Sequence, residues 1–302
     1  MKEDIESFLT YLTVEKGFSK NTIFAYRNDL YQLADFAEQE ATKHGSTASW
    51  ANFDRQGMIS YLINLKERNY AASTVARKVA ATRSFFDFMI AEGRIKEKPS
   101  QNIESPKIGR SLPKPISISQ VRRLLEQPAR LSAPEAKRDT AILQLLYASG
   151  MRVSELVALN VKDVDTEGGY VRCFGKGHKE RIIPIHRQAT VSVVEYLKES
   201  RPRLTHDDTE EALFLNRRGE RLTRQGLWQI LKGYAKAAEL EKEVTPHTLR
   251  HSFATHMLSG GADLRSVQEL LGHDNISTTQ VYTHLTTEHV RRVYEKSHPR
   301  AK

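Results

Sequence analysis

A short proline-rich segment divides this sequence into two unlike parts, and no other feature constrains the fold as strongly. Residues 105–115 read SPKIGRSLPKP, with three prolines, one glycine and no apolar period, which predicts an extended linker. The chain has 302 residues, enough for two domains that each bury a core. We therefore predict one domain at 1–104, a basic linker at 105–115 and a second domain at 116–302.

The first part of the chain has the apolar spacing of helices throughout. Ser19 and Ser73 stand where they would cap the second and the fourth of these predicted helices. The fourth helix also carries a basic row, Arg77, Lys78 and Arg83. Such a row is most simply a solvent-exposed face. Only the other basic features of the chain suggest that it binds phosphates.

The second part mixes helices with a short β-rich stretch. Helical patterns lie at 118–125, 138–149, 188–199, 223–239, 247–259, 263–271 and 286–296. Gly150 suits a left-handed end for one of these helices. Residues 169–185 instead hold two β-rich runs around the sequence GKGHK, which predicts a hairpin. The expected fold is mainly α with a small β-sheet, and the second domain is of the α+β class.

Charge and cysteine content narrow the class of protein. The chain carries 46 Lys and Arg against 37 Asp and Glu, a net charge of +9, which favours a polyanionic partner such as nucleic acid or an acidic membrane. Charge alone leaves open a basic protein with no such partner. The one cysteine, Cys173, excludes a disulfide within the chain and a cysteine zinc cage. The start MKEDIESFLTYL is unlike a secretion signal, and no run of about 18 apolar residues occurs. We expect a cytoplasmic protein that is not bound to a membrane.

Side chains suited to chemistry are concentrated at 245–284. His247 and Arg250 are three residues apart, so on a helix they share a face and can meet one phosphate. His273 follows at a predicted helix end, and Tyr282 lies nine residues further on. Each of them taken alone is most simply a surface or packing residue.

A zinc site is the sharpest alternative use of these histidines. His247 and His251 have the i, i+4 spacing of a helical zinc pair, but Thr248 stands where such a motif needs its glutamate. The nearest acidic residues, Asp263 and Asp274, lack ligand spacing. We therefore expect no metal.

Two further basic residues lie upstream of this region. Arg152 follows the glycine that ends a predicted helix, in ASGMRVSEL. Lys176 sits between two glycines at the predicted hairpin tip, where flexible backbone can bring a cation close to a substrate. The GKG triplet lacks the GxxxxGK[ST] pattern and the following helix of a phosphate loop, so nucleotide binding is not expected.

Several motifs together resemble the tyrosine recombinases of the phage integrase family, in particular the bacterial and archaeal Xer group. These motifs are ASGMRVSEL, FGKGHKERIIPI, TPHTLRHSFATHML, LLGHDNISTTQVYTHL and the terminal HPRA, and they occur in family order. The helical first domain resembles the SAM-like core-binding domain of the family. The resemblance implies a DNA-binding domain at 1–104, a catalytic domain at 116–302 and a C-shaped clamp around double-stranded DNA.

The resemblance also implies a catalytic set. Carried over position by position, it comprises Arg152, Lys176, His247, Arg250, His273 and Tyr282. In this reading the two guanidinium groups stabilise charge on the non-bridging phosphate oxygens. Lys176 is the general acid for the departing 5′-oxygen, and His247 is the base or proton shuttle. His273 donates a hydrogen bond to the phosphoryl group. Tyr282 forms a covalent 3′-phosphotyrosine, and Glu155 matches an acidic position that buttresses the site in relatives. Neither Mg²⁺ nor ATP is then required.

The implied function is site-specific recombination through a Holliday junction, which resolves chromosome or plasmid dimers at a dif-like site on the nucleoid. A tetramer on two duplexes would carry it out, with or without a paralogous recombinase and an activating DNA translocase. The last helix, 286–296, would dock on a neighbouring protomer or pack on its own domain. The alternatives are a phage or transposon integrase, a type IB topoisomerase and a DNA-binding protein without activity.

Overall fold

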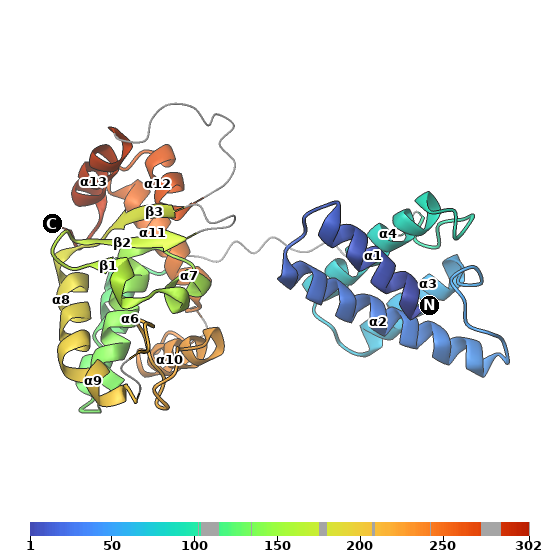
Figure 1. The fold of residues 1–302 in the computed structure, drawn as a ribbon, viewed down its shortest axis with the longest axis horizontal. Helices are drawn as coiled ribbons and strands as arrows, with labels where there is room; N and C mark the ends of the chain where they lie inside the picture. Colours follow the sequence, from blue (N-terminus) through green and yellow to red (C-terminus); the bar gives the residue numbers. More distant parts are fainter. Residues whose placement is uncertain are drawn as a thin grey trace. The chain divides into compact units, whose positions relative to one another are not determined.

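A computed structural model describes residues 1–101, 103, 115–133, 135–174, 180–206, 209–241, 243–272 and 285–301, with only the backbone for 285–287. The chain forms two compact units, Met1–Ser111 and Leu112–Lys302 (Figure 1). Of the predicted linker at 105–115, only Pro115 lies within the described residues. No helix in the described ranges is long and apolar enough to span a membrane.

The first unit is built from helices that pack around an aromatic core. The helices are α1 (Lys2–Val14), α2 (Lys20–Lys43), α3 (Arg55–Glu67) and α4 (Ala72–Ala91). Ser19 caps α2 as predicted, since its side chain accepts a hydrogen bond from the Thr22 N–H. Trp50 and Phe85 meet edge to face at the centre, with ring centroids 5.0 Å apart.

Two expectations for α4 are wrong. Ser73 lies inside the helix, whose N-cap is Ala71 without a side-chain hydrogen bond. Lys78 is not on a solvated face, because it is buried and its Nζ donates to Asp29 Oδ1 at 2.9 Å. Arg77 pairs with the same carboxylate. The basic row is therefore partly neutralised within the unit, and Lys78 is not free to meet a phosphate.

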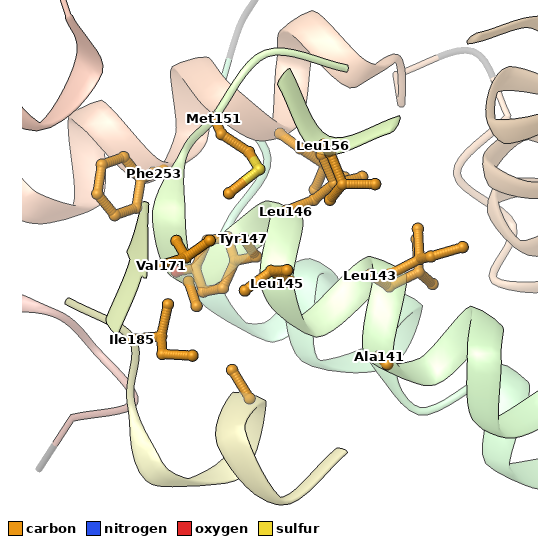
Figure 2. Close-up of a cluster of buried hydrophobic side chains, with 14 of the residues drawn as sticks. Ala141, Leu143, Leu145, Leu146, Tyr147, Met151, Leu156, Val171, Ile185 and Phe253 are labelled. Carbon is orange, nitrogen blue, oxygen red and sulfur yellow. The ribbon is translucent and has the colours of Figure 1, made fainter. Parts of the chain in front are cut away.

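The second unit is organised around the helix α6 (Glu135–Ser149), which is buried on nearly every side. The helices α5 (Ile118–Leu125), α7 (Val153–Ala158) and α8 (Arg187–Glu195) pack against it. Figure 2 shows its apolar side chains gathered in one cluster with Phe253, Val171 and Ile185. The polar side chains that α6 buries have partners there, since Arg138 donates to Asp139 Oδ1 at 2.8 Å and to the Leu215 carbonyl at 2.9 Å.

In the described residues the sheet has three antiparallel strands in the order β1-β2-β3. They are β1 (Val164–Asp165), β2 (Tyr170–Phe174) and β3 (Glu180–Pro184). The predicted hairpin is confirmed by the pairing of β2 with β3, in which Cys173 lies opposite Arg181. The small strand β1 and the helix α7 were not predicted.

The remaining helices complete the second unit. They are α9 (Arg201–Leu204), α10 (Arg224–Ala237), α11 (Pro246–Ser259), α12 (Leu264–Leu271) and α13 (Leu285–Ser297), with a π-helical turn at Tyr196–Ser200. The helices α12 and α13 both pack against β3, beside α11 (Figure 1). The prediction of a mainly helical chain with a small sheet is confirmed.

Candidate active site

Arg152 is placed by the end of one helix and the start of the next. Gly150 adopts the left-handed conformation, φ +59°, that ends α6, as predicted. The chain then turns, and Arg152 becomes the N-cap residue of α7. Its backbone N–H donates to Glu155 Oε2 at 2.7 Å, which fixes the turn. The Arg152 side chain is 44% exposed, so a substrate can reach it.

Glu155 joins two arginines from different elements. Its Oε1 accepts from Arg152 Nη1 at 3.0 Å, within the first turn of α7. Arg181, on β3, donates to both carboxylate oxygens, from Nη1 at 3.0 Å and from Nη2 at 2.7 Å. Burial acts to raise the pKa of Glu155, but the hydrogen bonds from Arg181 and Arg152 lower it below its usual value. The carboxylate is therefore ionised and holds both guanidinium groups.

Arg250 is held by backbone carbonyl groups at the C-terminal ends of two helices, α6 and α12. Its Nη1 donates to the Gly150 carbonyl at 2.8 Å, and its Nη2 donates to the Leu271 carbonyl at 2.6 Å. Burial and the neighbouring charge of Arg152 lower the pKa of Arg250 to about 10. It remains charged at neutral pH.

The cluster attracts an anion. Arg152, Arg181 and Arg250 face one carboxylate, Glu155, so the group carries two net positive charges at neutral pH. Arg152 and Arg181 both act to lower the pKa of Arg250, so an anion bound beside Arg250 stabilises its charged form. Planar guanidinium forks are suited to phosphate oxygens.

His247 is on the same helix as Arg250. It is the second residue of α11, whose N-terminus is capped reciprocally by Thr245 and Thr248. The imidazole is exposed, and Arg250 follows three residues later on the same helix, as predicted. In the part of the chain that the structure describes, no three His, Cys, Asp or Glu side chains are grouped as metal ligands.

Three predicted site residues, Lys176, His273 and Tyr282, lie outside the described residues. The described neighbour of His273, Gly272, lies close to the arginine cluster. Gly272 precedes His273 and ends α12 in the left-handed conformation. A Cβ atom at Gly272 would lie 3.0 Å from Arg181 Nη1, so the chain enters this segment directly against the cluster.

Comparison with models of protein families identifies the family of this chain. The model described as the phage integrase family matches residues 115–289, and the model of the phage integrase N-terminal SAM-like domain matches residues 5–93. The chain belongs to the phage integrase family. The family resemblance predicted from the motifs is thereby confirmed, and this phage integrase family member is a tyrosine recombinase.

Curated relatives agree over almost the whole length of this family member. Tyrosine recombinase XerC of Herpetosiphon aurantiacus is 52% identical over 288 residues, which is 95% of this chain and 92% of the relative. Tyrosine recombinase XerD of Oceanobacillus iheyensis is 45% identical over 298 residues, 98% of both chains. A solved structure of XerH site-specific recombinase bound to its palindromic difH substrate has the same fold. Its TM-score is 0.67 at 23% identity, over 97% of this chain and 94% of that one.

Arg181 is the residue of this site that the sequence analysis missed. It was read only as part of a β-rich run. A signal was present, because alternation along β3 places Arg181 on the same face as Ile183, which is buried. A charged side chain on the buried face of a strand requires a partner. Its partner, Glu155, is 26 residues away in sequence, and only the fold brings the two together.

Proposed function

We propose that this chain is a site-specific recombinase that breaks and rejoins DNA through covalent attachment to Tyr282. The observation that carries the proposal is the pair of guanidinium groups, Arg152 and Arg250, held beside one another by Glu155 and by helix-end carbonyls. These contacts fix both groups before substrate arrives, which is the requirement for electrostatic stabilisation of a phosphoryl transition state. The motifs that contain Lys176, His273 and Tyr282 complete the set in sequence.

In the proposed cleavage step, the Tyr282 oxygen attacks the scissile phosphorus and the bond to the 5′-oxygen breaks. Arg152 and Arg250 bind the non-bridging oxygens, whose charge grows in the transition state. Lys176 donates a proton to the departing 5′-oxygen, and His247 accepts the phenolic proton or passes it on.

The products of this step are a 3′-phosphotyrosine and a free 5′-hydroxyl. His273 is expected to donate a hydrogen bond to the phosphoryl group. A 5′-hydroxyl from a second strand then reverses the attack, and Tyr282 leaves with its proton restored. Because one phosphodiester is exchanged for another through a covalent intermediate, the energy of the bond is retained and the cycle needs neither ATP nor a metal ion.

The proposed substrate is double-stranded DNA with a dif-like site. Relatives named XerC and XerD cover almost the whole chain, and the XerH structure contains the difH substrate of that protein. We propose strand exchange through a Holliday junction by a tetramer on two duplexes, which resolves chromosome dimers on the cytoplasmic nucleoid. A paralogous recombinase and a DNA translocase are the partners to test. The unit at 1–104 is proposed to bind one face of the duplex, and the unit at 116–302 to cut it.

A nicked duplex that traps the covalent intermediate tests the reaction. The nick lies close to the scissile phosphate, so the short strand with the 5′-hydroxyl diffuses away after cleavage and religation cannot occur. The parent protein is expected to form an adduct on a duplex with the dif-like sequence of its own chromosome. Tyr282→Phe is expected to shift the same duplex in a gel without any adduct. An adduct formed by Tyr282→Phe contradicts the proposal.

A plasmid with two such sites distinguishes the enzyme classes. Recombinant junctions that depend on both sites support site-specific recombination. Relaxation of a plasmid without sites, and no junctions, assigns the chain to the topoisomerase class instead. Junctions confined to the ends of a mobile element assign it to the transposon or phage integrases.

A further inference from the structure

The last two carbonyl groups of α12 are each bound by an arginine. Arg181 Nε donates to the Leu270 carbonyl at 3.2 Å, and Arg250 Nη2 donates to the Leu271 carbonyl at 2.6 Å. The carbonyl end of a helix carries the negative end of its dipole, so two cations there stabilise it. The chain leaves this point through Gly272 towards the segment with His273 and Tyr282.

Arg181 and Arg152 differ in how far solvent and substrate can reach them. Arg152, the third cation of the cluster, has a side chain 44% exposed, whereas the side chain of Arg181 is 13% exposed. The guanidinium group of Arg181 donates to protein atoms through all three of its nitrogens. Nη1 and Nη2 donate to Glu155, and Nε donates to the Leu270 carbonyl. Arg181 is therefore mostly buried, and it affects the site through the protein groups that it binds.

One guanidinium group therefore joins three elements. It lies on β3, the strand paired with β2, and it binds α7 through Glu155 and α12 through Leu270. Glu155 in turn binds the side chain and the backbone of Arg152. These contacts connect the end of α12 to Arg152, whose side chain is 44% exposed.

We propose that Arg181 is a positioning residue for the recombination reaction. It fixes Arg152 through Glu155, and it fixes the end of α12, after which the sequence continues to His273 and Tyr282, through the Leu270 carbonyl. The inference rests on the proposed function, because it assigns these residues to one phosphate. Displacement of a reacting group by about 1 Å lowers a rate by about 10²-fold, so loss of this contact set affects the chemical step much more than DNA binding.

Two substitutions at this position separate geometry from charge. Arg181→Gln removes the charge and the bidentate contact, while Arg181→Lys keeps the charge but provides only one donor group. Arg172→Gln is the control, because Arg172 lies on the exposed face of β2, paired with Ile182, and donates to the Lys162 carbonyl alone among described contacts. Circular dichroism and thermal unfolding establish that each variant is folded.

The measurement is the single-turnover rate of adduct formation with saturating nicked duplex, together with the dissociation constant for the same duplex. We expect Arg181→Gln to cleave about 10²-fold more slowly with a dissociation constant within about threefold of the parent's. Arg181→Lys is expected to recover part of the rate, and Arg172→Gln to match the parent. Cleavage by Arg181→Gln at the parent rate, or an equal loss in binding and cleavage, overturns the inference.

A double-mutant cycle tests whether Arg181 acts through Glu155. If it does, Arg181→Lys lowers the cleavage rate much less in a Glu155→Gln background than in the parent, since their shared contact is already lost. If the double variant loses the product of the two single-variant losses in cleavage rate, the inference is contradicted. Absence of any adduct with the parent protein is a failure of the proposed function instead, and the parent reaction in every experiment distinguishes the two.

Discussion

Three buried histidines make the second unit sensitive to acid. His298 follows α13 and is fully buried, and its ring lies 5.1 Å from that of His186, the N-cap residue of α8. His256 of α11 is buried nearby and binds the Tyr147 hydroxyl at 2.9 Å. Burial, and then the charge of Arg300, lower the pKa of His186 to about 4. Burial, with His186 as the next cause, lowers the pKa of His298 to about 3.

The backbone contacts explain why both rings are neutral. His186 Nδ1 accepts from the Ala189 N–H at 3.2 Å, and His298 Nδ1 accepts from the Arg300 N–H at 3.2 Å. Each Nδ1 must therefore be unprotonated, with the ring proton on Nε2. Protonation would end both contacts and place two charges side by side next to Arg300.

The sign of the pH dependence follows from these pKa values. An imidazole with a lower pKa in the folded state takes up a proton on unfolding, so stability is complete above about pH 6.5 and falls below it. The fall continues until the folded rings titrate, near pH 4 for His186 and pH 3 for His298. At pH 4.5 each ring lowers the free energy of unfolding by about 2–3 kcal/mol, a large part of the ~5–15 kcal/mol typical of a domain.

Urea unfolding between pH 7.5 and 4.5 measures this effect. The chain has two tryptophans, so in a Trp50→Phe background Trp228 reports on the second unit alone. His298→Phe keeps an aromatic ring against Tyr294 but does not titrate, and we expect it to lose about 2–3 kcal/mol of the pH dependence. His44→Gln, at an exposed position in the first unit, is the control. Equal pH slopes for His298→Phe and the control refute the reasoning.

Three further predictions concern the charge cluster, helix packing and DNA binding. Glu155→Ala leaves a buried guanidinium unpaired and is expected to destabilise the second unit by about 3–5 kcal/mol in urea unfolding, whereas Glu295→Ala, at an exposed pair, stays within about 0.5 kcal/mol. A Cβ at Gly260 would lie 2.0 Å from the Ser297 carbonyl oxygen, so Gly260→Ala is expected to lower stability by about 1–3 kcal/mol. At Gly233, in α10, nothing lies within 4 Å of such an atom, and Gly233→Ala is expected to raise stability by about 0.5–1 kcal/mol. DNA affinity is expected to fall ~10³-fold or more between 50 and 200 mM salt in gel-shift titrations, if ~6 phosphates are contacted; a flat salt response contradicts a backbone-binding clamp.

The parts of the fold that depend on neighbouring residues could be predicted from the sequence. The cap at Ser19, the left-handed Gly150 and the β2–β3 hairpin each follow from local turn and capping chemistry. The predicted cap at Ser73 was wrong because the helix begins two residues earlier. Its N-cap, Ala71, has no capping side chain, so the sequence carries no local signal for the start of this helix.

The contacts that depend on distant residues could not be predicted. Lys78 reads as part of an exposed basic row until Asp29, 49 residues earlier in the chain, is seen to bind it inside the unit. The role of Arg181 likewise depends on its contacts with Glu155 and Leu270, which belong to other elements. The resemblance implied a catalytic role for Arg152, Lys176, His247, Arg250, His273 and Tyr282, and all six roles remain predictions.

The central claim is that the phenol of Tyr282 becomes linked to DNA beside the two arginines. Mass spectrometry of the trapped adduct, after digestion by nuclease and protease, identifies the amino acid that carries the nucleotide. The account predicts one modified peptide, in which Tyr282 bears a nucleotide through a 3′-phosphate. A nucleotide attached to any other side chain contradicts it.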